Sequence, residues 1–132
     1  MAIKLERLIV CDAAVAGPMG VSVTAPLTDE LIDDNFLKCL VISISGDPGS
    51  YWLSIDIQPP ENHPPGYRDV GSPEYFSVPS DGSVSHRVVE LFIQKPVPGL
   101  WKIVISLANK RLGRIEFGIQ DKGDIESAPT TE

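Results

Sequence analysis

The sequence predicts an all-β protein that folds as a single antiparallel β-sandwich of about seven to eight strands. Three observations lead to this prediction. First, apolar and polar residues alternate in several short segments, as half-buried strands require. Second, the 12 prolines and 11 glycines lie largely between those segments, where they can form turns. Third, the 132 residues suit one domain, and 42% of them are hydrophobic, which is enough apolar surface for one core.

The clearest strand patterns lie in the middle of the chain. Apolar residues occupy every second position from Tyr51 to Gln58, which is the period of a strand with one buried face. Leu40 to Ser45 shows the same alternation, and Gly46 to Ser50 supplies turn-forming proline and glycine between the two segments. We therefore predict a β-hairpin over Phe36 to Gln58.

A second hairpin is predicted near the C-terminus. Alternate positions are apolar from Trp101 to Leu107 and from Ile115 to Ile119. Trp101 directly follows a glycine turn and begins the inward-facing series, so we expect it to anchor the core. The residues expected to face water on these strands are Lys102, Ser106, Arg114 and Glu116.

The remaining segments carry weaker patterns. Strands are predicted at Ile3 to Cys11, at Val21 to Ala25 and at Val88 to Gln94. Thr28 to Asn35 lacks the alternation of a strand. It could form one helical turn with Thr28 as its N-cap, because acidic residues follow directly and suit the helix dipole.

Two further segments are expected to lie outside the strands. Pro59 to Gly66 is predicted to be an extended, polyproline-like loop that crosses between sheets. Residues 121–132 are acidic and almost without apolar side chains, so we expect a flexible tail after a sandwich domain at residues 1–120. Short strands with glycine and proline turns in a domain of this size favour a sandwich of immunoglobulin-like or jelly-roll type.

The charge of the chain argues against two classes of partner. The formal net charge is −7, whereas nucleic acids and anionic membranes bind clustered lysine and arginine. Lys102, Lys110, Arg111 and Arg114 form a local basic cluster, which we interpret as solvated charges of a hairpin. No nucleic-acid or membrane partner is therefore predicted for this acidic protein.

The sequence also predicts a compartment. It lacks a signal-peptide core and any apolar stretch of about 18 residues or more, so we expect a cytoplasmic protein. Cys11 and Cys39 are the only cysteines, and both lie among apolar residues. We expect free thiols that behave as small hydrophobic groups, and a disulfide between them is the less favoured alternative.

A search for catalytic and metal-binding motifs predicts no catalytic residue, no metal site and no cofactor. The chain has no Gly-x-Ser-x-Gly, phosphate-loop, Cys-x-x-Cys or His-Glu-x-x-His pattern. His63 and Glu61 could form an acid–base pair, but a solvated loop histidine is the favoured interpretation, and His86 is expected at the surface. The acids from Asp29 to Asp34 lack the spacing of a calcium loop and are interpreted as a solvated turn.

Aromatic residues near the proline-rich loop are the candidate binding residues. Trp52 falls on the outward face of its predicted strand, and an exposed aromatic patch can bind a protein or stack on a sugar. Trp52 could instead be covered by the chain's own loop, and we favour that alternative. The full candidate set is Trp52, His63, Tyr67, Tyr75 and Phe76.

Three segments carry a resemblance to known proteins. Leu8 to Ala14 is a strand ending in Asp-Ala, Pro98 to Ile103 is a Pro-Gly-aromatic strand start, and Arg114 to Ile119 closes the last hairpin. Together they resemble a group of short bacterial β-sandwich proteins that are known only as a domain of unknown function. The last hairpin is also similar to the Gly-x-Trp/Tyr signature of pre-peptidase C-terminal-type modules. Neither resemblance implies an activity or a functional residue.

These observations lead to two hypotheses of different classes. The first is a non-enzymatic cytoplasmic β-sandwich that acts through protein contacts, with a larger partner or as a homo-oligomer. The alternative is a small-ligand or carbohydrate-binding module that uses the same aromatics, with Asp56, Asp69 or Glu74 to orient the ligand. An enzyme is the weakest interpretation, because Glu61 and His63 are its only acid–base candidates.

Overall fold

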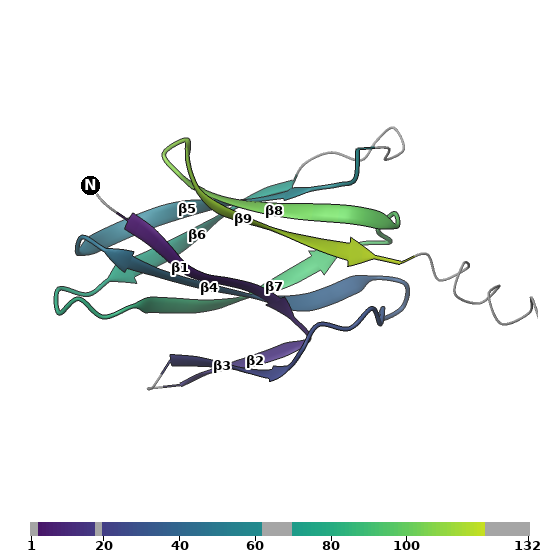
Figure 1. The fold of residues 1–132 in the computed structure, drawn as a ribbon, viewed down its shortest axis with the longest axis horizontal. Helices are drawn as coiled ribbons and strands as arrows, with labels where there is room; N and C mark the ends of the chain where they lie inside the picture. The colour runs from purple at the N-terminus through teal and green to yellow at the C-terminus, as the bar shows by residue number, and fades with distance from the viewer. Residues whose placement is uncertain (1–2, 18–19, 62–69, 121–132) are drawn as a thin grey trace, which may run out of the picture.

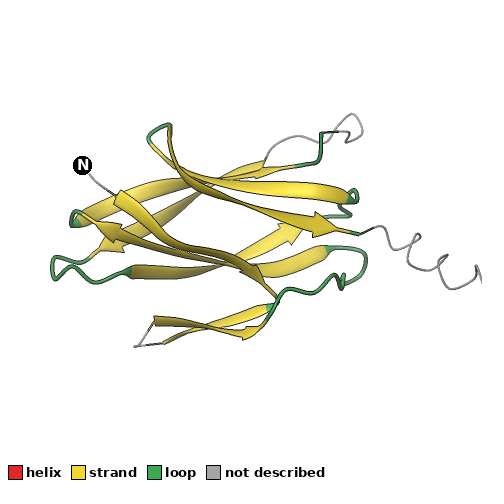
Figure 2. Ribbon diagram, in the orientation of Figure 1, coloured by secondary structure: helices red, strands yellow, loops and turns green. Residues whose placement is uncertain are grey.

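The computed structural model describes residues 3–17, 20–61 and 70–120, and all regular structure within these ranges is β-strand (Figure 2). The nine strands are β1 (Ile3–Cys11), β2 (Ala13–Gly17), β3 (Gly20–Ala25), β4 (Phe36–Gly46), β5 (Gly49–Gln58), β6 (Val70–Val78), β7 (Ser85–Ile93), β8 (Gly99–Leu107) and β9 (Lys110–Ile119). The all-β prediction is confirmed, with nine strands in place of seven to eight. The predicted tail at residues 121–132 lies outside the described residues.

The strands form a β-sandwich with an additional third layer (Figure 1). A four-stranded sheet in the order β6-β5-β8-β9 packs against a three-stranded sheet in the order β1-β4-β7, and every strand pair is antiparallel. The hairpin of β2 and β3 lies on the other side of the three-stranded sheet (Figure 1). The predicted antiparallel sandwich is therefore confirmed.

The main core fills the space between the two larger sheets. Its members are the inward-facing residues that the alternation predicts, including Leu40 and Ile42 on β4 and Leu53 and Ile55 on β5. The rings of Phe36 and Phe117 stack across the layers, with their centroids 5.1 Å apart. Burial of these side chains is the main favourable contribution to the free energy of folding.

A smaller core lies between the three-stranded sheet and the β2–β3 hairpin. Cys11, Val21 and Val41 form its buried centre, and Val23 and Val88 pack against them. As a result β4 is buried on both faces, which accounts for its continuous apolar run from Leu40 to Ile42.

The predicted hairpin over Phe36 to Gln58 is wrong, although both of its strands are present. β4 pairs with β1 and β7, whereas β5 pairs with β6 and β8. The turn at Asp47 and Pro48 therefore carries the chain from one sheet to the other. The two strands face each other across the core through their side chains, and Tyr51 Oη donates a hydrogen bond to the carbonyl oxygen of Asp47 at 2.7 Å.

The predicted hairpin near the C-terminus is confirmed. β8 and β9 pair along their whole length, and the turn residues Ala108 and Asn109 have φ angles of 49° and 68°. These positive φ values are typical of the tight turns that join antiparallel strands. Trp101 is buried as expected, and its indole Nε1 donates a hydrogen bond to the carbonyl oxygen of Val97 at 2.9 Å.

The predicted helical turn at Thr28 to Asn35 is also wrong. The segment is irregular and ends in a small antiparallel bridge between Ile32 and Asn35. Asp33 and Asp34 have φ angles of 52° and 65°, which belong to a tight turn and are incompatible with a right-handed helix.

Thr28, which follows β3, has a different role. It binds Asp12 at the corner where the chain leaves β1 for the outer hairpin. Its hydroxyl donates a hydrogen bond to Asp12 Oδ2 at 2.6 Å, and its backbone N–H donates to Asp12 Oδ1 at 2.9 Å. Lys38 Nζ lies 2.8 Å from the same Oδ1 atom, and only 4% of the Lys38 side chain is exposed. This ion pair connects the end of β1 to the start of β4.

Trp101→Ala is expected to lower the free energy of unfolding by about 3–5 kcal/mol, because it removes a large buried side chain and leaves a cavity. The change can be measured by urea unfolding monitored by circular dichroism. Leu100→Ala is the matched control, since Leu100 precedes Trp101 on β8 and is exposed. A Trp101 variant as stable as the control would contradict the placement of this residue in the core.

The fold should also depend on the charge of Asp12. Partial burial raises the pKa of this carboxyl, but hydrogen bonds from Lys38 and Thr28 outweigh that effect and lower the pKa from 3.8 to about 2. The ionised form therefore stabilises the fold above pH 4, and this stabilisation, about 2 kcal/mol, is lost as the pH falls through 2.

Asp12→Asn should remove this part of the acid dependence. Stability measured in denaturant between pH 2 and pH 5 is expected to vary less in Asp12→Asn than in the wild-type protein. Asp29→Asn is the control, because Asp29 lies on the exposed linker after β3. Equal acid dependence in both variants would show that the Asp12 carboxylate does not stabilise the fold.

Candidate functional site

The candidate site is the outer face of the four-stranded sheet, and its main feature is an exposed aromatic pair. Trp52 on β5 is 62% exposed, and Tyr75 on β6 is 41% exposed. The two residues are register partners on neighbouring strands. Their ring centroids lie 5.3 Å apart with an interplanar angle of 62°, an edge-to-face arrangement.

The aromatic pair is held in place from the tyrosine side. Tyr75 Oη donates a hydrogen bond to Ser50 Oγ at 2.7 Å, near the start of β5. Cross-strand aromatic contact and this hydrogen bond restrict the rotamers of Tyr75 before any ligand arrives. A pre-ordered aromatic surface loses less side-chain entropy on binding than a mobile one.

Polar and charged residues continue the same face away from the aromatic pair. Ser54 and Asp56 follow Trp52 at every second position of β5, so they share its side of the sheet. Lys102 on β8 is the register partner of Glu116 on β9. The face therefore combines an aromatic end with a middle in which both signs of charge occur.

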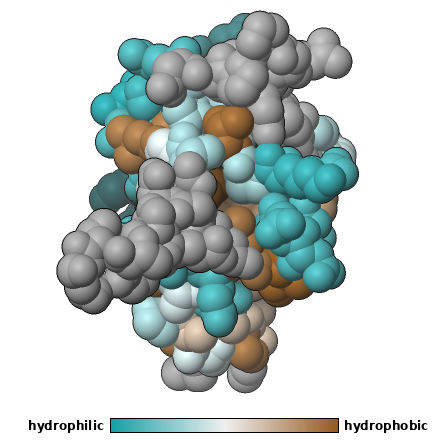
Figure 3. Space-filling model, turned by 90° about the vertical axis from the view of Figure 1, so that its right-hand side faces the viewer, coloured by the Kyte–Doolittle hydropathy of each residue, from teal (hydrophilic) through white to brown (hydrophobic). Residues whose placement is uncertain are grey.

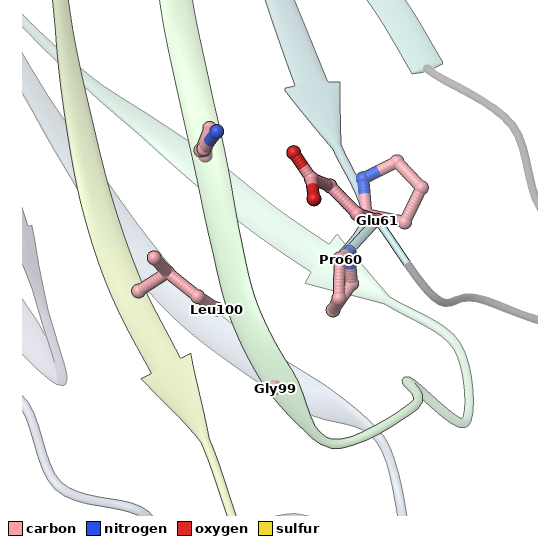
Figure 4. A pocket seen from close by; sticks show the side chains of 6 residues that line it. Pro60, Glu61, Gly99 and Leu100 are labelled. Atoms are coloured by element: carbon pink, nitrogen blue, oxygen red, sulfur yellow. The ribbon is translucent and has the colours of Figure 1, made fainter.

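A shallow hollow lies toward the other end of this sheet (Figure 4). Its volume is about 360 Å³, and it is lined by Pro59, Pro60, Glu61, Gly99, Leu100 and Lys102. Pro60 and Glu61 lie on one side of the first residues of β8, and Leu100 lies on the other (Figure 4). Trp52 and Gln58 are six positions apart on β5, which is about 20 Å of extended strand.

Gly99 shapes this hollow. Its φ angle is 135°, and a Cβ atom at this position would lie 2.8 Å from Cγ of Pro60. Only glycine combines this backbone conformation with such close contact to the proline. The Pro-Gly turn before Trp101 thus allows the end of β5 to approach the start of β8.

The structure brings together two of the five predicted binding residues. Trp52 and Tyr75 form the aromatic pair, and Trp52 is exposed, so the favoured expectation that it is covered is wrong. Phe76 is 2% exposed and belongs to the main core, because it follows Tyr75 on the strand and points to the opposite face. His63 and Tyr67 lie outside the described residues.

The polar residues proposed to orient a ligand are also separated. Asp56 lies on the face of Trp52, whereas Asp69 is outside the described residues. Glu74 accepts a hydrogen bond from Arg87 Nε at 2.9 Å and so connects β6 to β7 at the side of the sandwich. Glu74 is therefore removed from the candidate site.

One pairing that the sequence did not predict joins Ser43 and His86. Ser43 Oγ lies 2.6 Å from Nδ1 of His86, which is exposed as expected. The two residues are register partners on β4 and β7. Ser43 is buried in the three-stranded sheet, so its hydroxyl cannot meet a substrate from solution, and the hydrogen bond connects the two strands.

Other polar features of the described residues suggest no cation site or basic surface. In the described ranges no group of three or more histidine, cysteine or acidic side chains is arranged to hold a metal ion. Arg114 from the basic cluster lies 3.5 Å from Glu116, so an acid accompanies the basic residues on the outer face. Among the same residues, no helix is long and apolar enough to cross a membrane.

At the end of the sandwich that Figure 3 shows, the residues not drawn in grey form no single broad hydrophobic surface. Viewed from the end on the right-hand side of Figure 1, the hydrophobic surface that is not drawn in grey is divided into separate patches by hydrophilic side chains (Figure 3). The exposed aromatic pair on β5 and β6 thus stays the best-defined candidate within the described residues.

Comparison with solved structures shows where the same fold occurs. β-Glucosidase 3B from Thermotoga neapolitana in complex with glucose matches with a TM-score of 0.61 and 10% identity, over 91% of this chain and 16% of that chain. A β-glucosidase from Kluyveromyces marxianus in complex with glucose matches with a TM-score of 0.50 and 8% identity, over 90% of this chain and 14% of that chain.

At these identities the likeness is one of fold, and the chain spans about a sixth of the length of the first glucosidase. No protein-family model and no curated protein matches the sequence significantly, so the two family resemblances seen in the sequence stay predictions.

Proposed function

We propose that this protein is a non-enzymatic binding module that docks to a folded protein partner through the outer face of the β6-β5-β8-β9 sheet. The observation that carries the proposal is the exposed, edge-to-face pair of Trp52 and Tyr75. Tryptophan and tyrosine are the side chains most enriched among residues that dominate the binding energy of protein interfaces. The cytoplasmic location expected from the sequence stays a prediction.

The arrangement of the layers favours this face over the other outer face. The β2–β3 hairpin packs on the three-stranded sheet and buries Val41 and Cys11. On the four-stranded sheet, the described residues leave Trp52 with 62% of its surface in water. Leaving so large an apolar side chain exposed forgoes a burial energy of about 1.5–3 kcal/mol, which a partner could recover on binding.

The chemistry around the aromatic pair suits a protein surface. Protein interfaces combine a central aromatic group with a polar rim. Asp56, Lys102 and Glu116 provide both signs of charge on the same sheet face, so a partner with mixed charges would be complementary. In the two glucosidases the fold is a small part of a much longer chain, which is consistent with a module that packs against other protein domains.

A carbohydrate is the second candidate ligand, and a specific observation favours it. Ser54 and Asp56 follow Trp52 on the same sheet face, where hydroxyl and carboxylate groups can orient a sugar that stacks on the indole. Both glucosidases of similar fold are described in complex with glucose. In this alternative, one or a few sugar units would contact Trp52 and Tyr75.

Trp52→Ala is expected to weaken binding to the protein partner at least about 30-fold, the loss of about 2 kcal/mol that defines a dominant interface residue. The partner can be isolated by crosslinking the intact protein in its native cell, and its affinity can then be measured by calorimetry with the purified components. The melting temperature of the variant should stay close to that of the wild type, because Trp52 lies outside the core.

Phe92→Ala is the matched control for this measurement. Phe92 is also an exposed aromatic residue, with 49% of its surface in water, but it lies on β7 in the other sheet. Its removal should leave the affinity unchanged. Equal affinity in wild-type protein and Trp52→Ala would exclude the proposed surface, and an effect confined to Phe92→Ala would move the site to the other sheet.

The carbohydrate alternative gives a different result. Titration with a panel of glucans and monosaccharides should leave the tryptophan fluorescence of the wild-type protein unchanged if the partner is a protein. A saturable fluorescence change that is lost in Trp52→Ala would show that the ligand of this face is a sugar and would contradict the protein-partner proposal. Self-association that is detected by sedimentation and lost in Trp52→Ala would identify the partner as a second copy.

A further inference from the structure

The two cysteines of the chain lie opposite each other on paired strands. Cys11 is the last residue of β1, and Cys39 on β4 is its register partner. Both thiols are free. Cys11 and Cys39 also belong to the same small core, together with Val41 and Val21, so both side chains lie on the hairpin side of the three-stranded sheet.

This placement gives the two cysteines the Cα spacing of a disulfide bond. Directly opposed residues of an antiparallel pair have Cα atoms about 4.5–5.5 Å apart. Disulfides form between residues whose Cα atoms are about 4.4–6.8 Å apart. Because the two side chains also share one face, a rotation about the side-chain bonds can join the sulfur atoms of Cys11 and Cys39 with little movement of the backbone.

The two thiols differ in their access to solvent. Cys11 is 1% exposed, whereas Cys39 is only half-buried. Cys39 lines a surface hollow of about 360 Å³ together with Ile32, Leu37 and Val88. A small oxidant can therefore reach Cys39 from the solvent, while Cys11 lies behind it.

The surroundings of the two thiols also indicate which of them would react first. Cys39 Sγ lies 3.8 Å from the backbone carbonyl oxygen of Asp12, to which the thiol donates a weak hydrogen bond. Burial, followed by the neighbouring Cys39, raises the pKa of the Cys11 thiol above its usual value of 9.0. Cys11 therefore has less thiolate at neutral pH than an ordinary cysteine, and its burial behind Cys39 suits it to react second, after Cys39 has been modified.

We propose that Cys11 and Cys39 form a redox-active site that reacts with low-molecular-weight disulfides, of which oxidised glutathione is the probe. The Cys39 thiolate attacks one sulfur of glutathione disulfide, a mixed disulfide forms, and one glutathione thiolate leaves and takes up a proton. Cys11 loses its proton to solvent and attacks the Cys39 sulfur, and the second glutathione leaves. Two cysteine thiols are oxidised, and one glutathione disulfide is reduced to two thiols.

A disulfide between Cys11 and Cys39 would lie where the three-stranded sheet is connected to the β2–β3 hairpin. Cys11 directly precedes Asp12, where the chain leaves the three-stranded sheet for the outer hairpin. A disulfide to Cys39 would fix this point to β4 and close the chain between the two positions. The oxidised protein is therefore expected to melt at a higher temperature than the reduced protein, because the crosslink restricts the unfolded chain.

The experiment uses the reduced full-length chain in buffers of graded glutathione disulfide content. After alkylation of free thiols, intact mass should show a monomer that has lost two hydrogens and takes up no alkylating reagent. Cys11→Ser should stop at the mixed disulfide on Cys39, and Cys39→Ser should react much more slowly. The reaction of the wild type should accelerate as the pH rises, because the thiolate is the attacking form in thiol–disulfide exchange.

Several outcomes would overturn the proposal. Wild-type protein that accumulates a stable mixed disulfide, or only disulfide-linked dimers, would show that Cys11 does not resolve the adduct. Oxidation that requires denaturant would show that the thiols are closed to solvent in the folded protein. Phenylarsine oxide, which bridges adjacent thiols, provides a second measurement on unmodified protein, and failure of both cysteines to bind it together would also contradict the proposal.

Discussion

The ion pair between Asp12 and Lys38 is the interaction on which the layered arrangement depends. Lys38 is a buried cation whose Nζ donates to Asp12 Oδ1 at 2.8 Å and to Thr28 Oγ1 at 3.2 Å, and it lies 5.7 Å from the centre of the Phe36 ring. A buried charge without its partner costs several kcal/mol, so both groups must be in place together. Asp12 marks where the chain leaves β1, and Thr28 lies on the segment that returns to β4. The pair therefore holds both ends of the excursion that contains the β2–β3 hairpin.

The position of that hairpin decides which sheet face stays open. Because the hairpin covers the three-stranded sheet, the side chains of Val41 and Val88 are apolar and packed on that side. The four-stranded sheet has no such cover among the described residues, and its outward positions carry Ser54, Asp56 and Lys102 around the aromatic pair. One outer face is covered by the hairpin and the other is open. This difference supports a binding role for the exposed Trp52, since single exposed apolar residues are common on protein surfaces and need no functional explanation.

The sequence predicted which side of each strand is buried better than it predicted which strands pair with each other. Alternation placed Leu53, Ile55 and Trp101 inside, because the period of two depends only on which side of a strand is buried. The same alternation cannot tell a strand that pairs in one sheet from a strand that faces it across the core, so β4 and β5 were joined into a hairpin. β2 was missed because Ala13 to Gly17 is short and poor in β-branched residues, and β6 because it contains Pro73.

The same limit explains which parts of the candidate site were predictable. Tyr75 and Phe76 are consecutive, so once β6 is known to be a strand only one of them can reach the surface. The partner of Trp52 required the register of β5 and β6, which depends on tertiary packing. The opposition of Cys11 and Cys39 is equally a matter of register, since a shift of one residue would have placed the two thiols on opposite faces.

The two proposed sites lie on opposite sides of the main core, and this separation has a consequence. Cys11 and Cys39 lie in the small core beneath the hairpin, whereas Trp52 lies on the far side of the four-stranded sheet. Between them stand the fully buried side chains of Ile42 and Leu53, which belong to the close-packed main core. Coupling between distant sites requires an element with two states that both sites bias. Oxidation of the cysteines should therefore stiffen the hairpin without changing the affinity measured at Trp52, and the two sites can be tested independently.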